Sequence, residues 1–397
     1  MNLNGLSSKI IRRFLYNAVP VKKNPAYKNA PHVPVMSREV LEYLKPEDSQ
    51  TIIDMTFGAG GHSKLILQNA PNIKLITLDR DPLAYEYAQD LQKQYPDNVV
   101  PLLGRFSELP SLLKENHIKQ NSVDGILFDF GCSSMQFDIA DRGFALSKDG
   151  PLDMRMDQNR YKNQVTAADV LAKASEHELY RIFKVYGEEK QARKIARAIV
   201  ETRYAFKRLE TTKELADLVF ACFDNEYKLD KIQRQSHPAT KIFQALRIFV
   251  NDELNEINYG MIVAQKYLKI GGRMITLTFH SLEDTIVKRH IAGNIVNDVA
   301  NTLPLKYCSY QITHDRAVLD PLMQSKWEQL NKHVIVPKFE EIEDNPRCRS
   351  AKLRAASAPV QMLRIHGRVG NPGILEISPT IGTIKPAPKN KFTFLIK

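Results

Sequence analysis

A cluster of glycines and a later aspartate stand where apolar runs of the sequence end. In TIIDMTFGAGGHS, Gly58, Gly60 and Gly61 follow the first of these runs. Glycine lets the backbone turn tightly and approach a ligand without a side-chain clash. Asp79 ends the next run, 18 residues after Gly61, about where a ribose-binding carboxylate would lie. The spacing predicts a nucleoside-binding loop, with a strand-to-helix turn that binds nothing as the alternative.

This loop lacks the features of two common nucleotide sites. A dinucleotide fingerprint, G-x-G-x-x-G, needs glycine where Ser63 stands, and a Walker loop needs a G-K-[ST] that does not follow. S-adenosylmethionine fits better, because it has no phosphates and offers Asp79 a ribose diol that donates hydrogen bonds. Phe106, in GRFSEL, is then the expected apolar wall for the adenine, with an ordinary core phenylalanine as the alternative.

The stretch ILFDFGCSSMQFD contains D-F-G, the tripeptide that holds magnesium in protein kinases. The sequence has no kinase-type glycine-rich hairpin, strand lysine or H-R-D loop, so we interpret this match as a coincidence. Asp129 stands instead where amino-group methyltransferases carry a D/N-P-P-Y/F motif that grips the target amine, although D-F-G-C-S-S replaces the prolines here. Acceptors for both amine protons favour a pyramidal, nucleophilic nitrogen, and alignment supplies much of the rate. Asp129 is the candidate acceptor, with a role in capping the following turn as the alternative.

These residues require strands and helices that bring them to one edge of a sheet. Strands are predicted in TIIDMTF, KLITLDRD, VVPLLGRF, VDGILFDFG and GGRMITLTFHS, with helical patterns between them. This alternation predicts an α/β fold with a doubly wound, mostly parallel sheet. About 100 residues before HPATK have helical periodicity and predict a helical domain inserted into one crossover. The expected divisions are a leader, 1–30; the two parts of the sheet domain, 31–140 and 237–357; the inserted substrate-binding domain, 141–236; and a loosely ordered basic tail, 358–397.

Composition restricts the class of protein. No stretch of the 397 residues approaches the roughly 18 apolar residues that a membrane-spanning helix needs. The four cysteines form no CxxC pair, so neither a disulfide framework nor a metal site is expected. Residues 1–38 contain seven basic residues and no acidic one. This leader, with LSSKIIRRFLYNAV able to form an amphipathic helix, predicts a mitochondrial transit peptide; a basic arm that binds RNA or nothing is the alternative.

Six blocks of the sequence together are too specific for chance. They run in order from about His32 to Ala356 and are DMTFGAGGHS, DRGFALSKDGPLDMRMD, YGEEKQARKIARAI, HPATKIFQALRIFVNDEL, TFHSLEDTIVKR and NPRCRSAKLR. With them the chain resembles the bacterial MraW/RsmH family, S-adenosylmethionine-dependent methyltransferases that modify a cytosine N4 amine in small-subunit ribosomal RNA. The basic leader makes it look like the mitochondrial branch of that family.

The resemblance implies a Rossmann-like class I methyltransferase fold and S-adenosylmethionine as the cofactor. It implies a catalytic role for Asp129, and cofactor contacts for Gly60, Gly61, His62, Asp79, Phe106, Asp129 and Gln136. Departures are mild, because Cys132, Met135 and Cys348 stand where the family usually has a small apolar residue, a proline and an alanine. The implied partners are mitochondrial small-subunit rRNA or the assembling small subunit, with assembly factors as further ones, in the mitochondrial matrix.

Residues for the substrate follow from the same blocks. We interpret DRGFALSKDGPLDMRMD as a lid over an exposed or flipped base, with Arg142 and Arg155 in it and Phe144 as the stacking residue. A loop that pins the helical domain by internal ion pairs is the alternative. His280 and Ser281, which follow the last predicted strand, are expected to border the same cleft.

A basic stripe is predicted on one helix of the insertion. In YGEEKQARKIARAIVETR, Ile195 and Ile199 would face a core, while Arg193 and Arg197, with Lys190 and Lys194, would face outward. Given an RNA substrate, this stripe and NPRCRSAKLR are expected to contact phosphates. A solvated helix face is the alternative.

The sequence leaves three other functions as alternatives. Carbon-5 cytosine methyltransferases attack the ring with a cysteine, which Cys132 would supply, although the resembled family works without a cysteine there. A non-catalytic assembly factor would bind rRNA on the same fold, but the intact Gly60, Gly61, Asp79 and Asp129 argue against a decayed enzyme. Methylation of a small molecule fits poorly with the helical insertion and its basic stripe.

Overall fold

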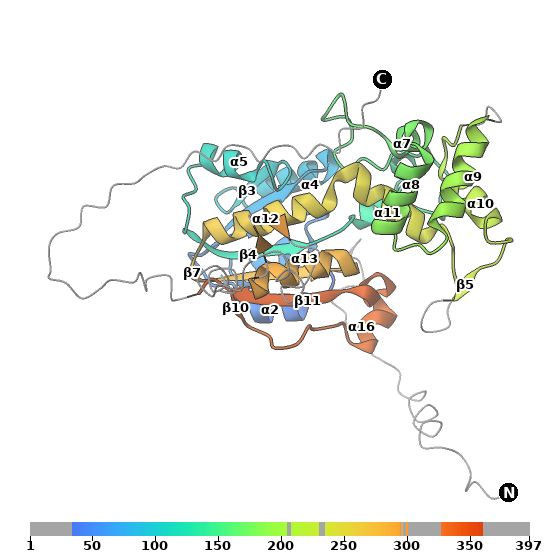
Figure 1. Ribbon diagram of the computed structural model, residues 1–397. Coiled ribbons are helices and arrows are strands. Elements are labelled where there is room, and N and C mark those ends of the chain that lie inside the picture. Colours follow the sequence, from blue (N-terminus) through green and yellow to red (C-terminus); the bar gives the residue numbers. More distant parts are fainter. Residues whose placement is uncertain are drawn as a thin grey trace, which may run out of the picture.

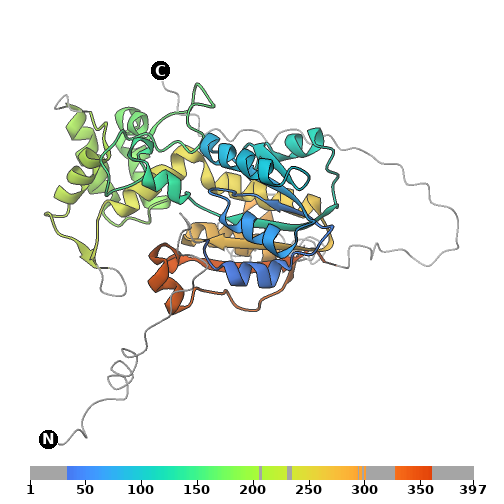
Figure 2. The same cartoon turned by 180° about the vertical axis from the view of Figure 1, so that it is seen from behind.

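The structure is a computed structural model that describes residues 34–204, 208–229, 235–293, 295–296, 299–300 and 327–359. The predicted transit peptide and nearly all of the predicted basic tail lie outside these residues. Among the helices described, none is long and apolar enough to cross a membrane. Figures 1 and 2 show a sheet flanked by helices, with a group of helices standing to one side of it.

The sheet follows the predicted doubly wound plan. Its order is β10-β11-β7-β4-β1-β2-β3, in which the five strands from β7 to β3 are parallel, β11 is antiparallel to β7, and β10 is antiparallel to β11. The strand order reverses between β1 and β4, and ligands of such folds bind beyond the carboxyl ends of the strands at this point. The strands are β1 Thr51–Asp54, β2 Lys74–Asp79, β3 Val99–Leu103, β4 Val123–Asp129, β7 Leu268–Thr278, β10 Glu328–Gln329 and β11 Lys352–Ser357.

The parallel strands are nearly continuous apolar runs because helices cover both faces of the sheet. Ile52 of β1 packs with α2, α3 and α4 on one face, whereas its neighbour Ile53 packs with α5, α12 and α13 on the other. Both side chains are fully buried. The helices are α2 Ser37–Leu44, α3 Gly61–Asn69, α4 Pro82–Gln94, α5 Leu109–Glu115, α12 Glu253–Tyr267 and α13 Ser281–Ala292.

All five strands expected from the sequence are present, but β10 and β11 were not predicted. β11 is KLRAAS, in which only Leu353 is a large apolar residue. Its strand character comes from pairing with β7 across the full length of the segment. The remaining short elements are α6 Ser134–Asp138, η2 Ala140–Arg142, α16 Phe339–Asp344, η3 Pro346–Ser350, and the paired strands β5 Lys228–Leu229 with β6 Gln235–Ser236 and β8 Ile295–Val296 with β9 Val299–Ala300.

The helical part has its own buried apolar cluster, which includes Leu179, Phe183 and Ile195. Thr211 caps α10 and Glu214 completes the capping box. The cluster also takes in α11 as far as Val250, so we propose a division after that residue in place of the predicted one at 237. The helices are α7 Ala167–Lys173, α8 Glu176–Val185, α9 Ala192–Tyr204, α10 Thr212–Ala221 and α11 Thr240–Asn251.

Asn251, at the end of α11, joins the helical part to the segment that follows β4. It is 1% exposed. Its Oδ1 accepts from the Met156 amide at 2.8 Å, and its Nδ2 donates to the carbonyls of Met154 at 2.7 Å and Arg247 at 2.9 Å. A buried backbone group that loses its partner destabilises a protein by about 1–3 kcal/mol.

We predict that Asn251→Leu lowers the free energy of unfolding by about 2–4 kcal/mol, because it leaves the Met154 carbonyl and the Met156 amide unpaired. The matched control is Asn255→Leu, since Asn255 is exposed and its amide donates to the side chain of Asp252. That change is expected to stay within about 0.5 kcal/mol of the wild type. Urea denaturation, monitored by circular dichroism, measures the free energy of unfolding of both variants. Equal losses for the two variants would contradict the role given to Asn251.

Candidate active site at the carboxyl edge of the sheet

A cavity of about 770 Å³ opens at the carboxyl ends of β1, β2 and β4. This volume is in the range of sites for small molecules and cofactors. The sheet domain and the helical part both contribute to its wall. Of the residues predicted from the sequence, those that line it are Gly61, His62, Asp79, Phe106, Asp129, Gln136, Phe144 and His280.

The glycine loop lies between β1 and α3 and forms part of this wall. Gly60 has a φ of 77°, and a Cβ atom there would lie 2.7 Å from the ring of Phe57, so the position requires glycine. Ser63, which breaks the dinucleotide pattern, is fully buried and donates a hydrogen bond to Asp54 at 2.6 Å. Its hydroxyl therefore ties the start of α3 to the end of β1.

Asp79 ends β2 and faces the glycine loop. Its carboxylate accepts hydrogen bonds from the backbone amides of Gly58 at 2.8 Å and Asp81 at 2.9 Å. Burial raises the pKa of Asp79 to about 7, which means that ionising this carboxyl in the free protein is unfavourable. Hydroxyl donors or a positive charge in the cavity would stabilise the ionised form.

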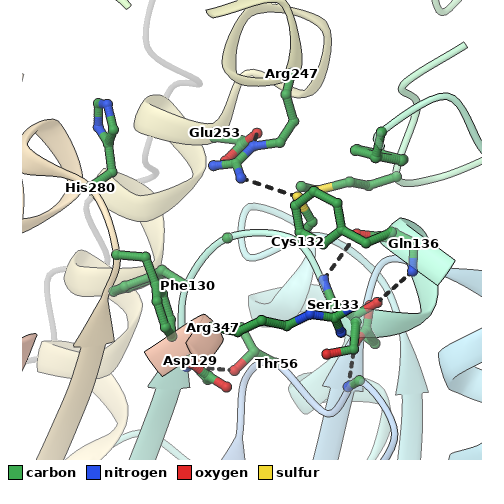
Figure 3. Close-up of a pocket in the computed structure, with 18 of the residues that line it drawn as sticks. Thr56, Asp129, Phe130, Cys132, Ser133, Gln136, Arg247, Glu253, His280 and Arg347 are labelled. Atoms are coloured by element: carbon green, nitrogen blue, oxygen red, sulfur yellow. Dashed lines mark hydrogen bonds and ion pairs between the residues drawn. The ribbon is translucent and has the colours of Figure 1, made fainter. Parts of the chain in front are cut away.

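Asp129 ends β4, and its backbone amide donates to the Thr56 hydroxyl at 2.6 Å (Figure 3). Its Oδ1 is buried and has no hydrogen-bond partner among the described residues. Burial, with added repulsion from Asp54 and Glu283, raises the pKa of Asp129 to about 8. An unpaired carboxylate oxygen at a cavity can accept a hydrogen bond from a ligand. No contact in the described structure shows Asp129 capping the following turn.

Two predicted cofactor residues also have structural contacts. The ring of Phe106 packs edge-on against Phe128, with centroids 5.6 Å apart, so it is a core residue and a cavity wall at once. The amide of Gln136 is 3% exposed. Its Oε1 accepts from the Ser133 amide at 3.1 Å, and its Nε2 donates to Asp81 at 2.9 Å. Gln136 thus caps α6 and fixes this wall of the cavity.

The segment predicted to be a lid is bonded into the protein. Arg142 is 8% exposed and donates to Asp81 at 2.7 Å and to the carbonyl of Met156 at 3.0 Å. Arg155 forms an ion pair with Asp153 at 2.6 Å. Phe144 is only 4% exposed and belongs to the apolar cluster of the helical part, although it borders the cavity. These contacts are the ones expected if the segment is a loop that holds the helical part by internal ion pairs, which was the alternative to a lid.

Arg247 of α11 is a cavity residue that was not singled out in the sequence. Its guanidinium pairs with Glu253 at 2.8 Å and its Nη1 lies 3.1 Å from the Cys132 sulfur (Figure 3). The signal was a single arginine inside the apolar helical run FQALRIFV, but its partners are separated from it in sequence. Burial raises the pKa of Cys132 to about 11, so the thiol stays protonated near neutral pH. This does not favour a nucleophilic role for Cys132.

His280 and Ser281 lie where β7 passes into α13. His280 is the N-cap residue of α13, and its Nδ1 accepts from the Leu282 amide at 3.1 Å. Burial and the charge of Arg247 lower the pKa of His280 to about 4, so this imidazole is neutral near pH 7. Ser281 is outside the cavity wall and donates to Glu188 at 3.2 Å.

The basic stripe is exposed, as predicted: Arg193, Lys194 and Arg197 lie on α9 and Lys190 lies just before it. Ile195 and Ile199 are buried beneath it. Arg193 lies over the ring of Tyr180 at 5.2 Å, and Arg197 lies 3.8 Å from Glu176. Both line a groove of about 660 Å³ between α9 and α10, apart from the larger cavity.

Most basic side chains of the block NPRCRSAKLR are paired with acidic side chains of the protein. Lys352 and Arg354 belong to β11 and both pair with Asp284. Arg347 lines the cavity and pairs with Asp138 at 3.0 Å. Among the described residues, no group of three or more histidine, cysteine, aspartate or glutamate side chains is arranged to hold a metal ion.

The chain is similar in sequence to several known proteins. The chain is 65% identical over 324 residues to a Culex quinquefasciatus protein called putative receptor-type tyrosine-protein phosphatase mosPTP-1; the match covers 82% of this chain and 22% of that protein. It is 55% identical over 329 residues to a probable methyltransferase-like protein 15 homolog of Drosophila melanogaster, with coverages of 82% and 92%. It is 46% identical over 334 residues to the human 12S rRNA N(4)-cytidine methyltransferase METTL15, with 82% of each chain covered.

The family model of the MraW methylase family matches residues 29–358, which include the glycine loop, Asp79, Asp129 and the whole helical part. The sheet order and the position of the cavity agree with the fold expected from the sequence. The chain belongs to the MraW methylase family.

Proposed function

We propose that this protein transfers a methyl group from S-adenosylmethionine to the N4 amine of a cytosine in mitochondrial small-subunit rRNA. The observation that carries the proposal is the buried, unpaired Oδ1 of Asp129 at the cofactor cavity. The human relative is named for N4 of cytidine in 12S rRNA, which supports the same atom and the same kind of RNA here.

The cavity suits S-adenosylmethionine in shape and charge. Asp79, at the end of β2, is placed to accept from the ribose hydroxyls, with the glycine loop beside it. Burial raises the pKa values of Asp54, Asp79 and Asp129 to about 6, 7 and 8. A ligand with a sulfonium and an ammonium group would stabilise these carboxylates in their ionised form. When bound, this cofactor supplies an activated methyl group.

The residues of the chain hold and align the amine. Ionised Asp129 accepts a hydrogen bond from N4, which turns the nitrogen lone pair toward the cofactor, and it can take the proton that the methylated amine releases. His280 is neutral and its Nδ1 is engaged at the start of α13, so no general-base step through it is needed. The half-buried ring of Phe106 and the buried ring of Phe144 give this part of the cavity an apolar wall.

We infer that RNA is held outside the cavity by the stripe on α9. Arg193 and Arg197 are exposed there and are paired only at the surface. A cytosine must leave its stack to reach Asp129, so the substrate is a single-stranded or flipped nucleotide. We also propose the mitochondrial matrix as the location, supported by the basic leader, and assembly factors of the small subunit as further partners.

One experiment tests the proposed function directly. Purified full-length protein is incubated with S-adenosylmethionine labelled in its methyl group and with immature mitochondrial small subunits, and any methylated nucleotide is mapped. We expect label on the N4 atom of a single cytosine. An absence of label in RNA would contradict the proposal and would favour a non-catalytic role in subunit assembly.

We predict that Asp129→Ala lowers kcat by roughly 100- to 1,000-fold, because the amine loses its acceptor. Asp129→Asn, which accepts a hydrogen bond but no proton, should fall between this variant and the wild type. Labelled methyl transfer to immature subunits measures the rates. Asp90→Asn, at an exposed position of α4, is the control. A wild-type rate for Asp129→Ala would exclude this role.

We predict that S-adenosylmethionine binds more tightly at pH 8 than at pH 6. The raised pKa values of Asp79 and Asp129 leave both carboxyls partly protonated near pH 7, and the cationic ligand favours their ionised forms. Binding at pH 7 should therefore release protons. Calorimetry in buffers with different ionisation enthalpies counts them. Asp79→Asn should release fewer protons, and a count of zero for the wild type would refute the linkage.

We predict that replacing both Arg193 and Arg197 by alanine makes RNA binding less dependent on salt. Each lost phosphate contact should reduce the slope of log K against log salt by about 0.7, the value for single strands. Fluorescence anisotropy with a labelled fragment of the small-subunit rRNA measures the slope between 50 and 200 mM salt. Lys93→Ala combined with Lys114→Ala, at exposed positions of α4 and α5 in the sheet domain, is the charge-matched control. An unchanged slope in the double variant would show a solvated helix face.

A further inference from the structure

One face of α11 forms the wall of the cavity on the side of the helical part. Thr240, Phe243, Gln244 and Arg247 line it, at the spacing of neighbours on one helix face. Arg247 fixes the end of this face, because it contacts the Cys132 sulfur at 3.1 Å and pairs with Glu253 (Figure 3). Cys132 follows Asp129 by three residues, so the face of α11 lies beside the strand end that carries Asp129.

Gln244, one turn before Arg247, is half-buried and differs from the buried amides of this region. Its Nε2 is buried and has no hydrogen-bond partner among the described residues. By contrast, the amides of Gln136 and Asn251 are bonded at both ends, to Ser133 and Asp81 and to backbone groups of the segment after β4. A buried donor without a partner destabilises a fold, so its presence at a cavity points to a ligand that pairs with it.

We propose that Gln244 binds the Watson–Crick edge of the target cytosine. Its Nε2 donates to N3 of the base and its Oε1 accepts one N4 proton, while Oδ1 of Asp129 accepts the other. This inference rests on the proposed function and names the second residue that holds the amine. The donor and acceptor of the amide match the adjacent N3 acceptor and N4 donor of cytosine, as glutamine matches adenine in DNA.

Two hydrogen-bond acceptors fix the orientation of the amine, which a single acceptor cannot do. With both protons held, the nitrogen cannot rotate out of line, and its lone pair is directed at the methyl group. Uracil presents a carbonyl oxygen at the same place, which the Asp129 carboxylate repels. Gln244 and Asp129 together therefore select cytosine and fix its orientation.

The first test uses full-length Gln244→Leu with immature small subunits and labelled S-adenosylmethionine. We expect kcat/KM for the subunits to fall roughly 10- to 100-fold, which corresponds to the loss of hydrogen bonds made in the transition state. The Kd for S-adenosylmethionine should not change, which also shows that the variant is folded. The matched control is Gln94→Leu, because Gln94 is exposed on α4. A wild-type kcat/KM for Gln244→Leu would overturn the proposal.

Gln244→Glu gives an independent test that keeps the size of the side chain. Glutamate can donate to N3 only when it is protonated, so the rate of this variant relative to the wild type should rise as the pH falls from 8 to 6. A ratio that is flat over this range would count against the hydrogen bond to N3.

A cycle that pairs the variant with a modified base locates the contact. Synthetic RNA spanning the mapped cytosine carries either cytidine or 3-deazacytidine, which has a C–H group in place of N3. The kcat/KM of the wild type should be at least ten-fold lower on the modified RNA than on the cytidine RNA. The kcat/KM of Gln244→Leu should be nearly the same on the two RNAs. Equal losses for the two proteins would overturn the proposal. If the wild type labels neither RNA nor subunits, the proposed function itself fails, a result that the variants cannot mimic.

Discussion

The buried ion pair between Asp81 and Arg142 holds the two parts of the molecule in register. Asp81 follows β2 and is 1% exposed, and Arg142 belongs to the segment that leads from β4 into the helical part. A buried pair of this kind is tolerated only when the remaining donors and acceptors are satisfied. Here they are, because Asp81 also accepts from Leu83, Gln136 and Gln158, while Arg142 donates to two backbone carbonyls.

The cavity exists because this contact and its neighbours fix two walls that the chain forms far apart in sequence. Asp157, fully buried, accepts from Arg80 at the end of β2 and from Arg105 after β3. Asn251 bonds the same segment from the side of α11. The strand ends supply one wall with Asp79 and Asp129, and the helical part supplies the other. A change in the segment after β4 would therefore alter the cofactor site and the substrate site together.

Features that depend on a short-range sequence pattern were predicted correctly. Features that depend on a partner residue distant in the sequence were not predicted. Asp79 and Asp129 were identified because each ends an apolar run, and strand ends of a parallel sheet meet at one edge. The sequence left two roles open for Arg142 and Phe144, because a charged loop can either cover a ligand or form ion pairs within the protein. The bond of Arg142 to Asp81, 61 residues away in the sequence, became visible only in the structure. Strand β11 was missed for the same reason, since its pairing with β7 defines it.

Two polar atoms at the cavity differ from the bonded polar side chains around them. Gln136, Arg142 and Asn251 have their polar atoms bonded to the protein, and each stabilises the fold. Oδ1 of Asp129 and Nε2 of Gln244 are buried without partners among the described residues, and both residues line the cavity. An acceptor and a donor left unpaired destabilise the free protein by an amount that a bound base with the opposite pattern would recover. Cytosine, with an amine beside a ring nitrogen, has that pattern.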